Sequence, residues 1–160
     1  MKKIICMLIF LLFVASYFSI PATIAFEIEA NATPEKVKVG QLITVTSNNY
    51  PYYDPVIKIY DPSIEQYTDW VKKSNAFKTL PDGSVYATKV SGPIQEGKYW
   101  VWIYRATKEG KIVFGAPVLA PSPPFPPGTF FWCPTNPVTI NRVSHPMKSF
   151  MKILGFGKND

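Results

Sequence analysis

The residues that could do chemistry in this sequence are few and scattered. The single histidine, His145, has no cysteine or carboxylate near it, which argues against a metal or catalytic-triad role. Phosphate loops, Cys-x-x-Cys pairs and hydrolase motifs do not occur. Loop aspartates are typical turn formers and also candidate calcium ligands; here they are Asp54, Asp61, Asp69 and Asp82. The sequence predicts a protein that is not an enzyme and that holds no cofactor or metal.

Aromatic residues offer a second kind of chemistry, the recognition of sugar rings. Tyr50, Tyr52 and Tyr53 fall in one turn-rich loop, and Trp100 and Trp102 fall in one strand. Their flat faces are candidate glycan contacts. The alternative is that the tyrosines pack on prolines of their own loop and the tryptophans are covered by other parts of the protein.

The cysteines bear on disulfide chemistry. Cys6 lies in an apolar N-terminal run that would leave with a signal peptide, so Cys133 would be alone in the mature chain. No intrachain disulfide can then form. Cys133 is either a buried, inert thiol or the site of an intermolecular disulfide.

The N-terminal residues 1–25 have the pattern of a secretory signal peptide. A positive pair, Lys2-Lys3, precedes an apolar run over residues 4–18, and small residues end the segment at Ala25. Cleavage after Ala25 would place the protein outside the cytoplasm, secreted or at the cell surface. The alternative is an uncleaved membrane anchor, for which the apolar run is short.

The composition excludes some partners. The chain has 160 residues, of which 47% are hydrophobic, and a formal net charge of +6. Between residues 26 and 116 there are 11 basic and 10 acidic residues, so the charge excess lies near the two termini. No basic face for nucleic acid is expected.

One strand organises the rest of the chain. Residues 97–105 contain an unbroken run of β-branched and aromatic residues at 99–104, which predicts a central strand. Tyr99, Val101 and Ile103 share one face, which we expect in the core, opposite Ile43, Val45, Ile57 and Ile59. The other face would present an aromatic stripe that needs a cover. The expected stripe is Trp100, Trp102 and Tyr104, and its expected cover is Phe130, Phe131 and Trp132, from the same chain or a neighbour.

Other short apolar runs predict seven to nine strands between residues 26 and 119. Residues 41–47 and 56–60 give the clearest of these signals. Residues 63–71 fit a two-turn helix or an irregular crossover, opened by a capping box at Ser63. A short strand is expected at 76–80, and a strand that begins at Ser84 is expected to end at Gly92-Pro93. The fold class is therefore all-β, an antiparallel sandwich over residues 26–119.

The C-terminal part differs in composition. Prolines over residues 120–128 predict a stiff spacer, and residues 129–160 an apolar and basic tail. The tail ends in a short amphipathic helix pattern that could touch a membrane, as could an uncleaved signal. The candidate membrane contacts are Lys148, Phe150, Met151, Lys152 and Leu154.

Four structural motifs together resemble the secreted immunoglobulin-like modules of prokaryotic surface proteins, including macroglobulin-type domains. They are V-x-x-G-x-x-I-T-V at residues 37–45, V-I-K-I-Y-D-P at 56–62, Asp82-Gly83, and G-x-Y-x-V-x-I at 97–103. The likeness covers about residues 30–114 and implies an immunoglobulin-like sandwich, with Tyr99 as a tyrosine corner.

Together these observations predict a non-enzymatic module of the cell envelope that binds an envelope protein or itself. Two alternatives remain open. One is a surface-filament subunit that assembles by strand or tail exchange. The other is a glycan-binding adhesion module.

Overall fold

The computed structural model describes residues 28–67, 69–120, 122 and 124–143. The predicted signal peptide and the candidate membrane contacts Lys148, Phe150, Met151, Lys152 and Leu154 lie outside these residues, as does His145. Among the described residues no helix is long and apolar enough to cross a membrane.

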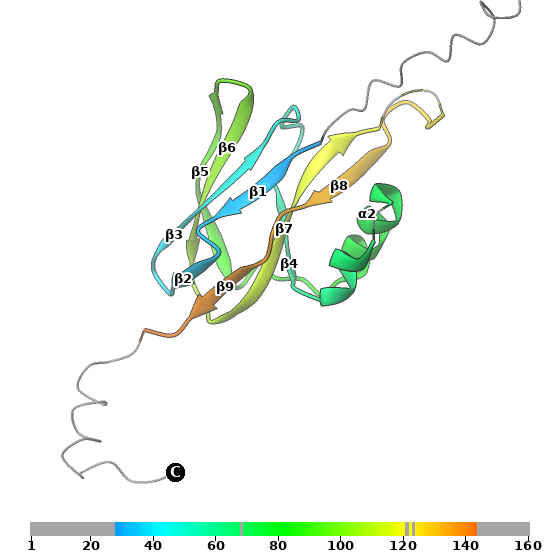
Figure 1. Ribbon diagram of the computed structural model, residues 1–160. Coiled ribbons are helices and arrows are strands. Elements are labelled where there is room, and N and C mark those ends of the chain that lie inside the picture. Colours follow the sequence, from blue (N-terminus) through cyan, green and yellow to red (C-terminus); the bar gives the residue numbers. More distant parts are fainter. Residues whose placement is uncertain (1–27, 68, 121, 123, 144–160) are drawn as a thin grey trace, which may run out of the picture.

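Two sheets make up most of this part of the chain (Figure 1). The first sheet contains, in spatial order, β1 (Ala30–Thr33), β3 (Leu42–Ser47), β6 (Tyr99–Ala106) and β5 (Ala87–Glu96). The second contains β2 (Lys36–Lys38), β9 (Val138–Asn141), β7 (Gly110–Leu119) and β4 (Val56–Ile59), with β8 (Phe130–Pro134) also paired to β7. The predicted all-β class is confirmed. One pair departs from the antiparallel expectation, because β2 and β9 are parallel.

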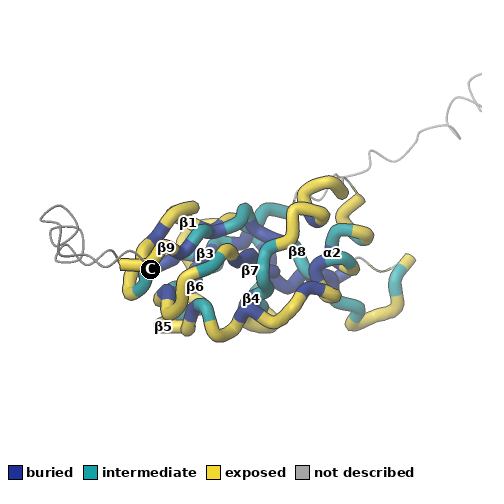
Figure 2. Tube along the Cα trace, turned by 90° about the horizontal axis from the view of Figure 1, so that it is seen from below, coloured by how far each residue is buried: buried dark blue, intermediate teal, exposed yellow. Residues whose placement is uncertain are grey.

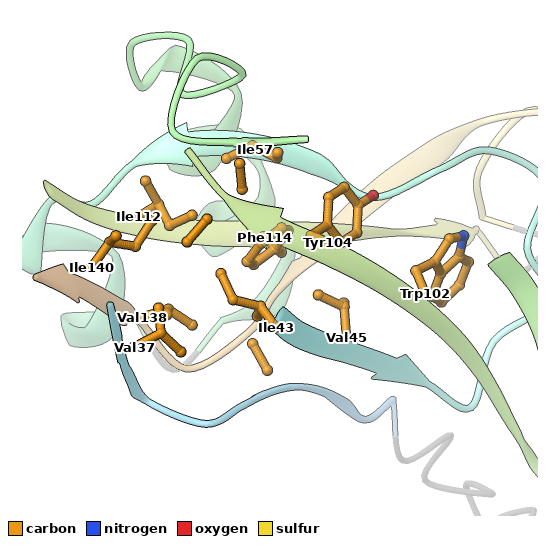
Figure 3. Packing of buried hydrophobic residues seen from close by; sticks show 13 residues of the cluster. Val37, Ile43, Val45, Ile57, Trp102, Tyr104, Ile112, Phe114, Val138 and Ile140 are labelled. Atoms are coloured by element: carbon orange, nitrogen blue, oxygen red, sulfur yellow. The ribbon is translucent and has the colours of Figure 1, made fainter. Parts of the chain in front are cut away.

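The main hydrophobic core lies between the two sheets, and the buried positions concentrate within the strands (Figure 2). Trp102 and Tyr104 of β6 point into it beside Ile43 and Val45 of β3, and Phe114 of β7 is also part of it (Figure 3). Trp102 and Tyr104 are 0% and 3% exposed. The predicted orientation of β6 was therefore wrong. Both of its faces are apolar, so alternation alone could not tell which face the second sheet covers.

The other face of β6 carries the residues expected inside. Tyr99 and Ile103 are only partly buried, and Val101 is buried but belongs to none of the core clusters. Tyr99 does not form the expected tyrosine corner, because its hydroxyl donates to the Glu29 carboxylate at 2.6 Å and not to a backbone carbonyl. Ile57 lies in the core as expected, whereas Ile59 is partly buried.

Strand β5 continues past the point where it was expected to end. Gly92 has a φ of +105°, and a Cβ there would lie 2.6 Å from the Val101 carbonyl oxygen. Glycine is therefore needed for its dihedral and for the close approach of the two backbones. The pairing of β5 with β6 shifts register around this point and resumes at Ile94. Gly92-Pro93, which was expected to end the strand, instead marks an irregularity within this edge strand.

Two helical segments connect β4 to β5. Asp61 caps the 3-10 helix η1 (Pro62–Gln66), and Asp69 caps α2 (Trp70–Thr79) by accepting from the Val71 and Lys72 amides. The strand expected at 76–80 was wrong, since most of it forms the last turns of α2. An aspartate cap before Trp70 and a proline after Leu80 were the available signals.

Residues assigned to the tail belong to the second sheet. β8 pairs with β7 of the same chain, and Ser74 of α2 accepts a hydrogen bond from the Trp132 amide at 2.8 Å. Pro117 lies within β7, although proline is usually confined to edge strands and bulges. The pairing of β4 with β7 stops at Gly115, so Pro117 has a partner strand on one side only.

The two ends of the described chain lie at opposite ends of the sandwich (Figure 1). Close to the N-terminal end, the side-chain amide of Asn136 links β1 to the segment between β8 and β9. It accepts from the backbone amide of Ala32 and donates to the carbonyl of the same residue. The β3–β4 loop and the start of β6 lie at the same end as the start of β1, because Ser47 pairs with both Ala30 and Trp100.

Candidate functional site

Five aromatic rings gather at this end of the sandwich, and we call them the aromatic end. Tyr50, Tyr52 and Tyr53 belong to the β3–β4 loop and are 62%, 47% and 58% exposed. Trp100 begins β6 and Phe130 begins β8; both are partly buried. Residues far apart in the sequence thus form one exposed aromatic surface.

The rings contact one another in a continuous series. Tyr50 lies 5.6 Å from Trp100 and 4.8 Å from Tyr52, measured between ring centroids. Phe130 lies 5.4 Å from Tyr52 and 5.2 Å from Tyr53. The planes of contacting rings are inclined by 59° to 71°, so the surface is corrugated and not flat.

Side chains of the core hold the second half of the β3–β4 loop by hydrogen bonds. The Asp54 carboxylate accepts from the Trp102 indole N–H at 3.2 Å and from the Lys89 ammonium at 2.6 Å. The next carbonyl, that of Pro55, accepts from the Tyr104 hydroxyl at 3.2 Å. Burial raises the pKa of Tyr104 well above its ordinary value, and the nearby charge of Asp54 raises it further. The hydroxyl is therefore a stable donor at neutral pH.

The first half of the loop is fixed by its polar residues. The Asn48 side-chain oxygen accepts from the backbone amide of Glu29 at 3.0 Å, and the backbone amide of Asn48 donates to the Glu29 carbonyl at 3.2 Å. The Ser47 hydroxyl accepts from the Asn49 amide at 3.2 Å. The three exposed tyrosines therefore project from a loop that is held at both ends.

Charges beside the aromatic end occur as opposite pairs. Lys89 pairs with Asp54, and Lys98 lies 3.8 Å from Glu29, whose carboxylate also accepts from the Tyr99 hydroxyl. Within the described residues, each of these two pairs holds one positive and one negative charge and therefore adds no net charge beside the rings.

The structure separates the residues that the sequence had grouped as a stripe and its cover. Of the stripe, Trp102 and Tyr104 are in the core and only Trp100 joins the aromatic end. Of the cover, only Phe130 does so. Phe131 and Trp132 instead contact aromatic residues of α2, Trp70 at 4.4 Å and Phe77 at 6.5 Å. The predicted pairing of stripe and cover was wrong, because Trp102 and Tyr104 are buried in the core between the two sheets.

Cys133 is free and partly buried beside Phe131. Burial raises the pKa of its thiol, and nearby Lys73 lowers it by a smaller amount. The thiolate is thus a minor species at neutral pH, which slows disulfide exchange.

Three of the four loop aspartates bond to neighbouring residues in the sequence. Asp61 and Asp69 cap helical segments, and Asp82 accepts from the amide and hydroxyl of Ser84, which lowers the pKa of its carboxyl group. No three potential metal-ligating side chains cluster within the described ranges. Sequence analysis missed the role of Asp54 as an anchor, because its partners lie 35 and 48 residues away.

A second candidate site lies at the opposite end of the sandwich. It is a shallow depression of about 300 Å³ that mixes apolar and charged side chains. Its lining residues are Val39, Thr107, Lys108, Glu109, Arg142 and Val143. It contains no ring cluster, and the aromatic end is the better defined surface.

Comparison with known proteins does not identify a relative. No family model matches the chain, and a search of curated proteins finds no match.

Proposed function

We propose that this chain is a non-enzymatic, immunoglobulin-like module of the cell envelope and that the aromatic end is its interaction surface. The observation that carries the proposal is the exposure of three tyrosines on a loop held at both ends. Exposed rings held in place bind with little loss of side-chain freedom, which is why tyrosine is favoured in contact surfaces.

The strand order supports the immunoglobulin-like part of the proposal. In their spatial order, β1, β3, β6 and β5 occupy the places of strands A, B, E and D, which form one sheet of such domains. In the second sheet β4 and β7 occupy the places of C and F, and β8 with β9 that of G. The short parallel strand β2 fits an N-terminal strand that crosses from one sheet to the other.

The extracytoplasmic part rests on residues 1–25, whose sequence fits a signal peptide. Cell fractionation of the full chain, tagged at its C-terminus, tests it. We expect the tagged protein in the envelope or the medium. Recovery in the cytoplasm alone would exclude the proposal.

Sedimentation with isolated envelopes tests the interaction surface. We expect the full chain to sediment with envelopes, and the double variant Tyr50→Ala/Tyr53→Ala to remain largely in the supernatant. Tyr67→Ala is the matched control, because Tyr67 is 43% exposed and lies outside the aromatic end. Equal sedimentation of the double variant and the control would assign the interaction to another surface.

A further inference from the structure

We infer that the aromatic end binds an uncharged, soluble glycan chain. The inference rests on the proposed function and names the ligand of the same surface. It draws on four properties of the described residues: hydroxyl-bearing rings, paired charges, the inclination of the rings and the fixed loop.

The exposed residues suit a ligand that is both apolar and polar. Tyr50, Tyr52 and Tyr53 each combine a flat apolar ring with a terminal hydroxyl that can donate and accept hydrogen bonds. A pyranose ring has the complementary form, with C–H groups on its faces and hydroxyls around its rim. A purely apolar ligand would leave three tyrosine hydroxyls without partners wherever it excluded water.

The neighbouring charges favour a neutral ligand. The Lys89–Asp54 pair and the Lys98–Glu29 pair flank the loop, and each contains one charge of either sign. Recognition of phosphate, sulfate or an anionic lipid surface draws on an excess of lysine or arginine. Among the described residues, these two pairs provide no such excess beside the rings, which disfavours an anionic polymer or a membrane as the ligand.

The inclination of the rings favours a single chain over a crystalline polymer. A flat crystal face is matched by coplanar rings, whereas contacting rings here are inclined by 59° to 71°. A soluble oligosaccharide can turn from one sugar to the next and so follow a corrugated surface. Because the loop is bonded at Asn48 and at Asp54, little ordering of the protein is needed on binding.

Affinity electrophoresis and calorimetry with defined glycans test the inference. The full chain is run through gels that contain soluble neutral polysaccharides, namely hydroxyethyl cellulose, xylan, mannan or laminarin. It is then titrated with the corresponding hexasaccharides and with chitohexaose. We expect retardation or heat of binding with at least one of these probes, and no binding to microcrystalline cellulose.

The variants assign the binding to the rings. We expect Tyr50→Ala/Tyr53→Ala to lower the affinity by about tenfold or more and Tyr67→Ala by less than about twofold, with both variants folded by circular dichroism. Trp100→Phe should lower the affinity while abolishing any ligand-induced change in the fluorescence of Trp100. Equal affinities of the double variant and the control would overturn the inference.

Other occupants give distinct results. Absence of binding to every neutral glycan would overturn the inference, even where the tyrosines still govern sedimentation with envelopes; the proposed function would then stand with another ligand. Tyrosine-dependent binding to phosphatidylglycerol vesicles, or tyrosine-dependent dimerisation in analytical ultracentrifugation without glycan binding, would likewise overturn it. Binding to glycans by a protein confined to the cytoplasm would instead overturn the proposed function alone.

Discussion

Two aromatic residues in the middle of β6 and the tyrosines of the β3–β4 loop have opposite positions in the structure. Trp102 and Tyr104 are enclosed between the sheets, whereas Tyr50, Tyr52 and Tyr53 are about half exposed. The residue types are similar, so the aromatic content of a segment does not decide its burial. The partner strands decide it, since β3 and β7 enclose Trp102 and Tyr104 with apolar neighbours, whereas the three loop tyrosines remain exposed.

The two groups are nevertheless linked. The polar atoms of Trp102 and Tyr104 bond to Asp54 and Pro55, which end the loop that carries the exposed tyrosines. The hydrogen bonds that satisfy the donors of these two buried side chains therefore also hold the loop of the aromatic end. Changes in the core should therefore reach the surface, whereas changes at the exposed rings should not reach the core.

The largest effect is expected from Trp102→Ala. Removal of a fully buried tryptophan should lower the free energy of unfolding by about 3–5 kcal/mol, through lost burial and the cavity that remains. Tyr53→Ala, at the exposed rings, should change it by less than about 0.5 kcal/mol. Urea unfolding followed by circular dichroism measures both. Similar losses for the two variants would remove the distinction between buried and exposed rings.

Two valines, Val45 of β3 and Val101 of β6, test which face of the first sheet lies inside. Val45 lies between the sheets, and Val101 lies on the opposite side of the first sheet. Val45→Thr should cost about 1–3 kcal/mol, because its hydroxyl would have no water or partner. Val101→Thr should cost less, since its neighbour across the strands is Thr46, which can share a hydrogen bond. A larger loss at Val101 would contradict the observed orientation.

The anchor of the loop is tested by two substitutions of Asp54. Asp54→Ala leaves the Trp102 indole without its acceptor and should cost about 1 kcal/mol or slightly more. Asp54→Asn keeps an acceptor and loses only an exposed ion pair with Lys89, which is worth about 0–1 kcal/mol. Thermal unfolding compares the two. If both variants lose the same stability, the indole hydrogen bond is not what fixes the loop.

Tyr104→Phe should have a small effect at neutral pH, about 0.5–1.5 kcal/mol, and a distinctive pH dependence. The pKa of Tyr104 is raised in the folded protein, so its ionisation stabilises the unfolded chain as the pH rises past about 10. The stability that Tyr104 provides is therefore present below pH 10 and is lost above it. Urea midpoints between pH 8 and 11 should converge for the two proteins. A constant difference would show that Tyr104 ionises equally in both states.

The sequence was sufficient to locate most strands. β3, β4 and β6 begin and end close to their predicted positions because β-branched and aromatic residues predominate there. The orientation of β6 was not predictable, because both of its faces are apolar and burial depends on a sheet distant in sequence. Residues 76–80 were misread because Ala76, Phe77 and Leu80 fit either period when taken alone. The cap at Asp69 resolves the ambiguity.

The candidate site was predictable in part. Tyr50, Tyr52 and Tyr53 stood out because they share a turn-rich loop, and they are exposed in the structure. Phe130 was expected over the stripe of β6 but contacts the loop tyrosines. Its position depends on the return of the chain as β8, which no local pattern at residue 130 could indicate.

The parallel pairing of β2 with β9 bears on how the protein would respond to pulling. These strands lie near the two ends of the described chain, and their backbones are joined by bonds from Thr139 to Glu35 and from Val39 to Asn141. Tension applied at opposite ends of the sandwich would slide the two strands along each other. All bonds of this short ladder would then bear the load together and would have to break almost at once, whereas a hairpin pulled open releases its bonds one at a time.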